Sequence, residues 1–174
     1  MKKKKGSSSG HNNKKKKPEI NLKDFQKWEP DETTEFMTSG FSLEFNETML
    51  DILCGLPKDI ALPLIENMVI RKFQKNLYAF VIPDWNKFIL IMSDDLIKLR
   101  ELNFKKFIFI FLHELTHIHL KHFSNLIEDS NIQTKMENEL EADKLTSTWM
   151  KDNFNFEVKE EYLIYKNKLI GADS

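Results

Sequence analysis

Two histidines four residues apart stand at the end of a strongly apolar segment, and this arrangement constrains the fold more than any other feature. The motif HELTH occupies residues 113–117 and directly follows the apolar run FIFL. The spacing of apolar residues predicts a helix over residues 104–122, with Asn103 as its N-cap. Side chains four apart lie one turn above each other, about 40° apart around a helix. Both histidines are therefore expected to point together toward the protein interior.

The imidazoles of His113 and His117 can converge on one Zn²⁺ ion, because imidazole nitrogen is a common zinc ligand. Glu114 lies about 100° around the helix from His113, beside such an ion but not bound to it. A carboxylate in that position can take a proton from a metal-activated water, so Glu114 is predicted to be the general base. The alternative is a pair of core histidines without metal. Without a metal, the polar atoms of two buried histidines and an acid on one helical turn are harder to provide with hydrogen-bond partners.

A catalytic zinc site needs a third protein ligand, and the sequence offers Glu139 on the next predicted helix. That helix is expected over residues 134–151, opened by a capping box at residues 134–137. Glu139 and Asp143 lie one turn apart on a half-apolar face, where unpaired carboxylates would be costly to bury. A metal bound by Glu139 and an imidazole N–H held by Asp143 would remove that cost. The alternative is a solvated acidic helix. Glu141 is expected on another face.

The other histidines near this motif are not predicted to bind the metal. His119 and His122 lie about 240° and 180° around the helix from His113, so we expect them at the surface or in a groove. The HExxHxxGxxH pattern of metzincins is absent, because Leu120 and Phe123 stand where its glycine and third histidine would be. By residue type alone, the side chains that qualify to stabilise a tetrahedral oxyanion are Tyr162, Tyr165, His119 and His122.

With these residues, the segment 77–150 resembles the gluzincin metallopeptidases, and most of all the small ImmA/IrrE-type proteins and related minimal gluzincins. The resemblance implies that His113, His117 and Glu139 bind zinc and that Glu114 is the base. It also implies a zincin-like α+β fold with a small sheet above the active-site helix. The edge strand of that sheet would hold an extended peptide by backbone hydrogen bonds.

The expected fold class is therefore α+β, with a small antiparallel sheet packed on the helix that carries HExxH and a following helix that carries Glu139. Asp143 matches a position where many relatives carry Asp or Asn in support of a ligand. Apolar β-prone runs predict the strands, and helix-start signals predict further helices. The predicted strands are residues 69–73, 77–82 and 87–92, and the further helices are residues 46–53, 56–67 and 93–101.

The chain divides by composition and charge into unequal parts. Residues 1–17 carry eight lysines and no acid, and we expect a disordered tail because they hold no apolar side chain. Residues 18–40 are expected to form a loosely structured lead-in, and residues 41–174 a zincin-like metallopeptidase domain. Outside the tail, 18 basic and 27 acidic side chains give a net charge of −9. This negative charge argues against nucleic-acid binding by the folded domain.

The role of the Lys-rich tail is left open by the sequence. It fits a nucleic-acid arm, a tether to acidic membranes, a nuclear import signal or a plain solvated tail. The single cysteine, Cys54, excludes an intrachain disulfide, and its apolar neighbours predict a buried core position. No apolar run approaches the ~18–20 residues of a membrane span, and no signal-peptide pattern is visible. We therefore expect a cytoplasmic protein without a membrane span.

These observations favour a zinc-dependent endopeptidase that hydrolyses a protein or peptide substrate through a metal-activated water, with Glu114 as general base. One alternative is a catalytically inactive, zinc-bound interaction or regulatory module with a basic arm. Another is a basic-tailed regulatory protein in which the HExxH motif is accidental. Metal content separates the last alternative from the other two. The substitution Glu114→Gln separates the enzyme from the inactive module.

Overall fold

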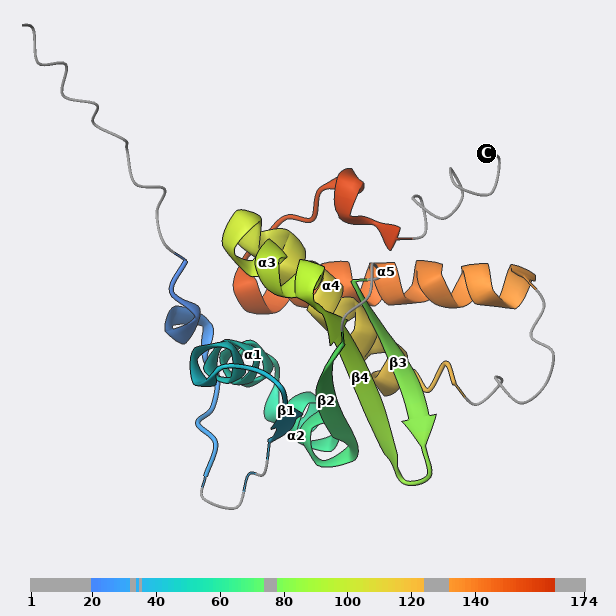
Figure 1. Ribbon diagram of the computed structural model, residues 1–174. Coiled ribbons are helices and arrows are strands. Elements are labelled where there is room, and N and C mark those ends of the chain that lie inside the picture. The colour runs from blue at the N-terminus through green and yellow to red at the C-terminus, as the bar shows by residue number, and fades with distance from the viewer. Residues whose placement is uncertain (1–19, 32–33, 35, 74–77, 124–131, 165–174) are drawn as a thin grey trace, which may run out of the picture.

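The computed structural model confirms the α+β class. Of the 174 residues, it describes those numbered 20–31, 34, 36–73, 78–123 and 132–164, so the Lys-rich tail lies outside the described residues. Figure 1 shows the elements, which are, in chain order, η1 (Leu22–Phe25), β1 (Met37–Ser39), α1 (Leu43–Gly55), α2 (Lys58–Asn67), β2 (Met68–Phe73), β3 (Ala79–Asp84), β4 (Lys87–Ser93), α3 (Asp94–Leu102), α4 (Phe104–His119), α5 (Ile132–Phe154) and η2 (Glu160–Tyr162).

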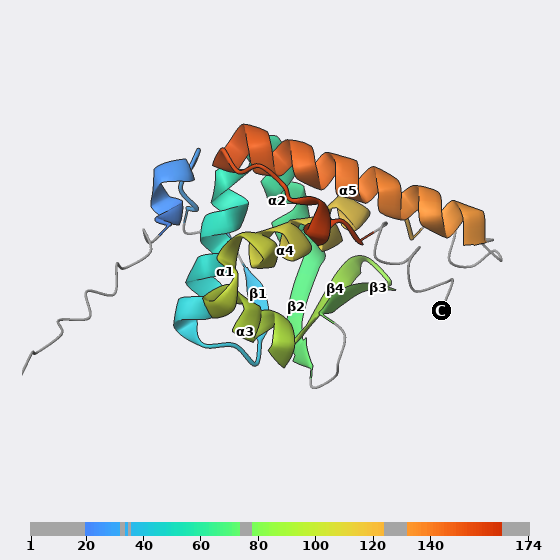
Figure 2. The same cartoon turned by 90° about the horizontal axis from the view of Figure 1, so that it is seen from above.

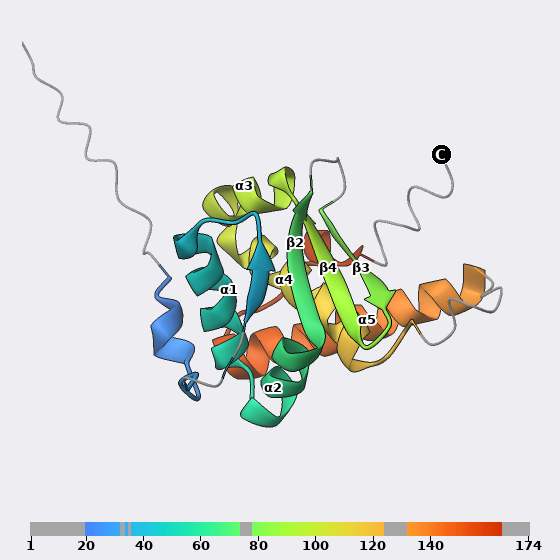
Figure 3. The ribbon, with the colours of Figure 1, turned by 60° about the horizontal axis from the view of Figure 1, so that its bottom comes forward.

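The sheet is mixed, which corrects the expectation of an antiparallel sheet. Its strand order is β1-β2-β4-β3; β1 and β4 are both parallel to β2, and β3 is antiparallel to β4 (Figure 3). β3 and β4 form a hairpin, but β4 rather than β3 pairs with β2. The apolar run at residues 88–92 suits β4 to a central position. Pro83 suits β3 to the edge, because proline has no N–H to donate to a second neighbour.

Helix α4 lies between the sheet and α5, and the views in Figures 1 and 2 agree on this placement. Every residue from Phe107 to Ile118 is buried. The sequence predicted one buried face, but α3, α5 and β3 all pack on this helix, as expected for a helix that is apolar all round. The side chain of Asn103 accepts a hydrogen bond from the Lys106 N–H and caps the helix as predicted. In the described residues no helix combines the length and the apolar composition needed to cross a membrane.

The described part of the expected lead-in packs against the domain. Leu22 is buried in the core, and Trp28 donates an indole hydrogen bond to the Leu56 carbonyl over 3.1 Å. β1 pairs with β2 through Met37–Ser39. A strand of three residues is too short to show a period-two pattern, so sequence reasoning had no signal for it.

Helix ends around the histidine motif differ from the predicted ones. α4 ends at His119 rather than near residue 122, and the chain then turns at Lys121, which has φ +56°. α5 begins at Ile132, so the predicted capping box at residues 134–137 lies inside the helix. The segment 154–169, whose sequence fits either a strand or a helix, forms the short helix η2 and irregular chain as far as it is described.

Cys54 is fully buried, as its apolar neighbours predicted. Burial, together with the charge of Asp51, raises the pKa of the thiol to about 11. A thiol of that pKa is almost entirely protonated at neutral pH, so Cys54 is a poor nucleophile.

We predict that Gly55→Ala destabilises the fold. A methyl group on Gly55, the last residue of α1, would lie 2.5 Å from the Cε1 atom of Phe154. The Phe154 ring is itself fully buried and has little room to move. Overpacking of this kind lowers the free energy of unfolding by about 1–3 kcal/mol, which urea denaturation would measure. Glu47→Ala, at an exposed position of the same helix, is the control and should stay within ~0.5 kcal/mol of wild type.

Candidate metal centre

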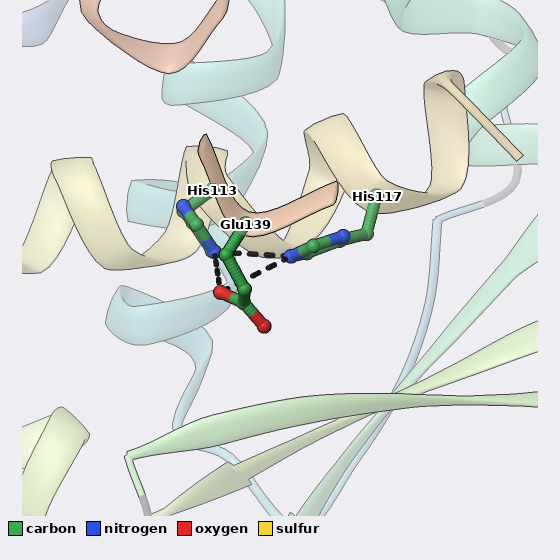
Figure 4. Close-up of side chains that lie close together, drawn as sticks. All are labelled: His113, His117 and Glu139. Carbon is green, nitrogen blue, oxygen red and sulfur yellow. Dashed lines mark hydrogen bonds and ion pairs between the residues drawn. The ribbon is translucent and has the colours of Figure 1, made fainter. Parts of the chain in front are cut away.

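His113, His117 and Glu139 each bring one ligand atom into a cluster whose atoms all lie within 4.8 Å of one another. The two histidines project from successive turns of α4, and Glu139 reaches them from α5 (Figure 4). His113 Nε2 lies 3.0 Å from His117 Nε2 and 3.2 Å from Glu139 Oε2. His117 Nε2 lies 3.8 Å from the same oxygen. The structure therefore brings together the three side chains that the sequence predicts as metal ligands.

The spacing of these three atoms fits a tetrahedral ion. Bonds of ~2.0–2.1 Å place neighbouring ligand atoms of a tetrahedral zinc site about 3.3–3.4 Å apart. The observed separations of 3.0, 3.2 and 3.8 Å straddle that value. Two imidazoles and one carboxylate are also a donor set that catalytic zinc sites use, with a fourth position left for water or substrate. The residues present therefore fit a zinc ion.

Asp143 supports His113 from the side opposite to the cluster. Its Oδ1 atom lies 3.0 Å from His113 Nδ1, and its side chain is only 4 % exposed. The same oxygen accepts a hydrogen bond of 3.2 Å from the backbone N–H of Ile164. The two contacts fix the carboxylate between α4 and the segment that follows α5. Asp143 thus lies where a side chain would have to be in order to orient the His113 ring.

Negatively charged carboxylates surround the imidazole ring of His113. Burial acts to lower the pKa of His113, but the adjacent carboxylates of Asp143 and Glu139 and the charge of Glu114 outweigh it and raise the pKa to about 9. Several carboxylates therefore converge on one buried imidazole. Such a site stabilises a positive charge, which is what a cation-binding site requires.

Small residues bring the two helices close enough for these contacts. Thr116 is fully buried; its hydroxyl donates to the His113 carbonyl over 2.7 Å and lies 3.5 Å from the Ala142 carbonyl. Across the same contact the Thr116 and Thr146 hydroxyl oxygens are 3.4 Å apart. Ala142 is fully buried between Glu139 and Asp143 along α5. The acids on either side of it are therefore held against α4.

A cleft of about 570 Å³ opens on the cluster. Glu114, which is 9 % exposed, lines this cleft together with His113, His117 and Glu139. The edge strand β3 borders it through Ala79–Val81 and the adjacent Tyr78. Glu114 therefore lies in the same cavity as the cluster, as its place on the helix predicts.

His122 is the residue that sequence reasoning misplaced. Extending α4 as a regular helix put it on the side opposite to His113, but the helix ends at His119 and the chain turns back. His122 Nδ1 lies 2.8 Å from His117 Nδ1, and His122 Nε2 lies 3.3 Å from Glu141 Oε2. Burial and the neighbouring His117 lower the pKa of His122, with Glu141 acting in the opposite direction.

Of the residues that qualified by type as oxyanion donors, the three that the structure describes do not direct a donor group into the cluster. Tyr162 lines the cleft, but its hydroxyl bonds to Asn103 Oδ1, about 15 Å along α4 from His113. His119 stacks edge-on against Trp149 and borders a different cavity. His122 contacts the far nitrogen of His117. Tyr165 lies outside the described residues.

Comparison with known proteins adds one family. The sequence profile of the family described as Peptidase U49 matches residues 82–172, just over half of the chain. The matched segment contains α4, α5 and the whole cluster. No curated protein and no solved structure matches the chain.

We predict that Asp143→Ala weakens zinc binding about 10–100-fold, because loss of the carboxylate frees the His113 ring. Competition with a chelator would measure the affinity, and thermal unfolding of the metal-free protein would measure any loss of stability. Asp152→Ala, at an exposed acid of the same helix, is the control and should bind zinc normally. Glu141 cannot serve as the control because it contacts His122. Equal affinity in the Asp143 and Asp152 variants would mean that Asp143 has no part in the metal site.

Proposed function

The chain belongs to the Peptidase U49 family, and from this membership we propose that it is a zinc-dependent endopeptidase. His113, His117 and Glu139 would hold the ion. The observation that carries the proposal is the convergence of these three side chains in a cleft beside an edge strand. The finer assignment to gluzincins of the ImmA/IrrE type is part of the same proposal. It rests on the HELTH motif and the position of Glu139 on the next helix.

Zinc at this cluster would supply a Lewis acid that polarises the scissile carbonyl and activates the attacking water. Glu114 would accept a proton from that water as its oxygen bonds to the carbonyl carbon, and would then deliver the proton to the leaving amine nitrogen. Its location in the cleft, nearly buried, limits exchange of that proton with bulk solvent. Asp143 would hold the His113 ring so that Nε2 stays turned toward the cluster.

The edge strand β3 is the proposed binding surface for the substrate. One side of β3 pairs with β4, and among the described residues the other side is the edge of the sheet, where residues 79–81 border the cleft. An extended polypeptide can add to such an edge as a further strand through main-chain hydrogen bonds. The peptide backbone would then run past the cluster. A protein segment in extended conformation is the substrate class that this arrangement favours.

We predict about one zinc ion per chain, measured by mass spectrometry of the purified protein. Substitution of any one proposed ligand by alanine should lower the zinc content, because a site with three protein donors loses one of them. His119→Ala is a matched histidine control, since His119 stacks on Trp149 instead of facing the cluster. Wild-type protein that is free of zinc, and stays so after zinc is added, would contradict the proposal. The variants are His113→Ala, His117→Ala and Glu139→Ala.

We predict that Glu114→Gln keeps the zinc but lowers peptide hydrolysis by about 10²–10⁴-fold, because an amide cannot accept the proton of the attacking water. A library of quenched fluorescent peptides would measure turnover, and zinc content would be measured on the same preparation. Unchanged turnover in the variant would exclude Glu114 as the base. If the wild type binds zinc but cleaves no peptide or protein, the alternative of a zinc-bound interaction module is favoured instead.

A further inference from the structure

The two ring nitrogens of His117 face different partners. Nε2 points toward His113 and Glu139, while Nδ1 is turned away from the cluster (Figure 4). His122 Nδ1 lies 2.8 Å from this Nδ1 atom, which is hydrogen-bond distance. His122 therefore contacts the ring on the side opposite to the proposed ion, and it cannot be a fourth ligand while His117 binds through Nε2.

The backbone at the end of α4 puts His122 in this place. The His122 N–H bonds to the His117 carbonyl over 3.1 Å, and the Lys121 N–H bonds to the Ile118 carbonyl over 3.1 Å. This pair of bonds, with Lys121 in the left-handed region at φ +56°, is a Schellman motif. A non-glycine residue in that conformation costs roughly 1–2 kcal/mol. The motif folds the chain back so that the main chain and the side chain of His122 both contact His117.

Glu141 completes the arrangement from α5. Its Oε2 atom lies 3.3 Å from His122 Nε2, and the His122 side chain is only 8 % exposed whereas that of Glu141 is 63 % exposed. The contacts form a chain from His117 through His122 to a carboxylate at the surface. Asp143 makes the corresponding contact to His113 directly. Both histidines of the cluster thus have a partner for the nitrogen that faces away from it.

With His117 and His122 both neutral, one assignment of protons gives each contact among His117, His122 and Glu141 a donor and an acceptor. His117 donates from Nδ1 to His122 Nδ1, and His122 donates from Nε2 to the carboxylate of Glu141. A proton on His117 Nδ1 leaves its Nε2 with a lone pair directed at the cluster, which is the form that binds metal. If His122 Nδ1 were the donor instead, the single proton of neutral His117 would lie on Nε2 and would block metal binding.

We propose that His122 is a positioning residue of the metal centre, which accepts the Nδ1 proton of His117 and holds Nε2 available for the ion, with Glu141 as its outer anchor. The inference rests on the proposed zinc site. It predicts that the zinc affinity depends on the hydrogen-bond acceptor of His122, and not merely on the volume of its ring.

Two substitutions separate these roles. His122→Phe keeps an aromatic ring of similar size but removes the acceptor. His122→Asn removes the ring but can place a carbonyl oxygen near the position of Nδ1. We expect His122→Phe to weaken zinc binding about 10–100-fold in competition with a chelator, and His122→Asn to stay close to wild type. His119→Phe, at the last residue of α4 and directed at Trp149, is the matched control and should bind zinc normally.

The outcomes distinguish this inference from the proposed function. Wild-type protein that binds zinc together with a His122→Phe variant of equal affinity would overturn the inference and leave the zinc site intact. The reverse order, with Asn impaired and Phe normal, would assign His122 a packing role and also overturn it. Wild-type protein that binds no zinc would overturn the proposed function and this inference with it. If His122→Phe does not fold, the exposed Glu141→Ala decides: weaker zinc binding supports the chain of contacts, and unchanged binding contradicts it.

Discussion

The close approach of α4 and α5 is the constraint on which the rest of the site depends. At the contact, the hydroxyls of Thr116 and Thr146 and the methyl group of Ala142 are fully buried, so little bulk separates the helices. Glu139 lies one turn before Ala142 and Asp143 directly after it, and both carboxylates reach the same imidazole. A wider separation would withdraw both acids from His113 at once. Packing of small side chains therefore sets the electrostatics of the cluster.

The acids of α5 are divided among the imidazole nitrogens by their position along the helix. Glu139 faces Nε2 of His113, Asp143 faces its Nδ1, and Glu141 faces Nε2 of His122. Burying imidazole rings in a core is costly unless their polar atoms find partners. Here carboxylates face both nitrogens of His113 and Nε2 of His122, while His122 faces Nδ1 of His117. Three of the acidic side chains outside the Lys-rich tail thus lie beside buried imidazole rings.

The sequence predicted those parts of the fold and site that follow from helical periodicity. The common direction of His113 and His117, and the placing of Glu139 and Asp143 on one face of the next helix, required only a period of 3.6 residues. His122 was misplaced because the same period was extended past the end of α4. A glycine at the left-handed position would have marked the turn, but Lys121 occupies it. The mixed sheet was missed for a different reason: the apolar run at residues 88–92 and Pro83 suit β4 to the centre and β3 to the edge, but neither pattern shows that β4 runs parallel to β2.

The all-round burial of α4 has a consequence for how the chain is made. Synthesis proceeds from the N-terminus at about 5–20 residues per second, so the 47 residues from His117 to Ile164 take roughly 2–10 s to add. Throughout that interval α4 has been translated, but α5 and the segment after it, which pack on α4 in the folded state, are incomplete. Until they are complete, this apolar helix cannot be buried as it is in the folded protein.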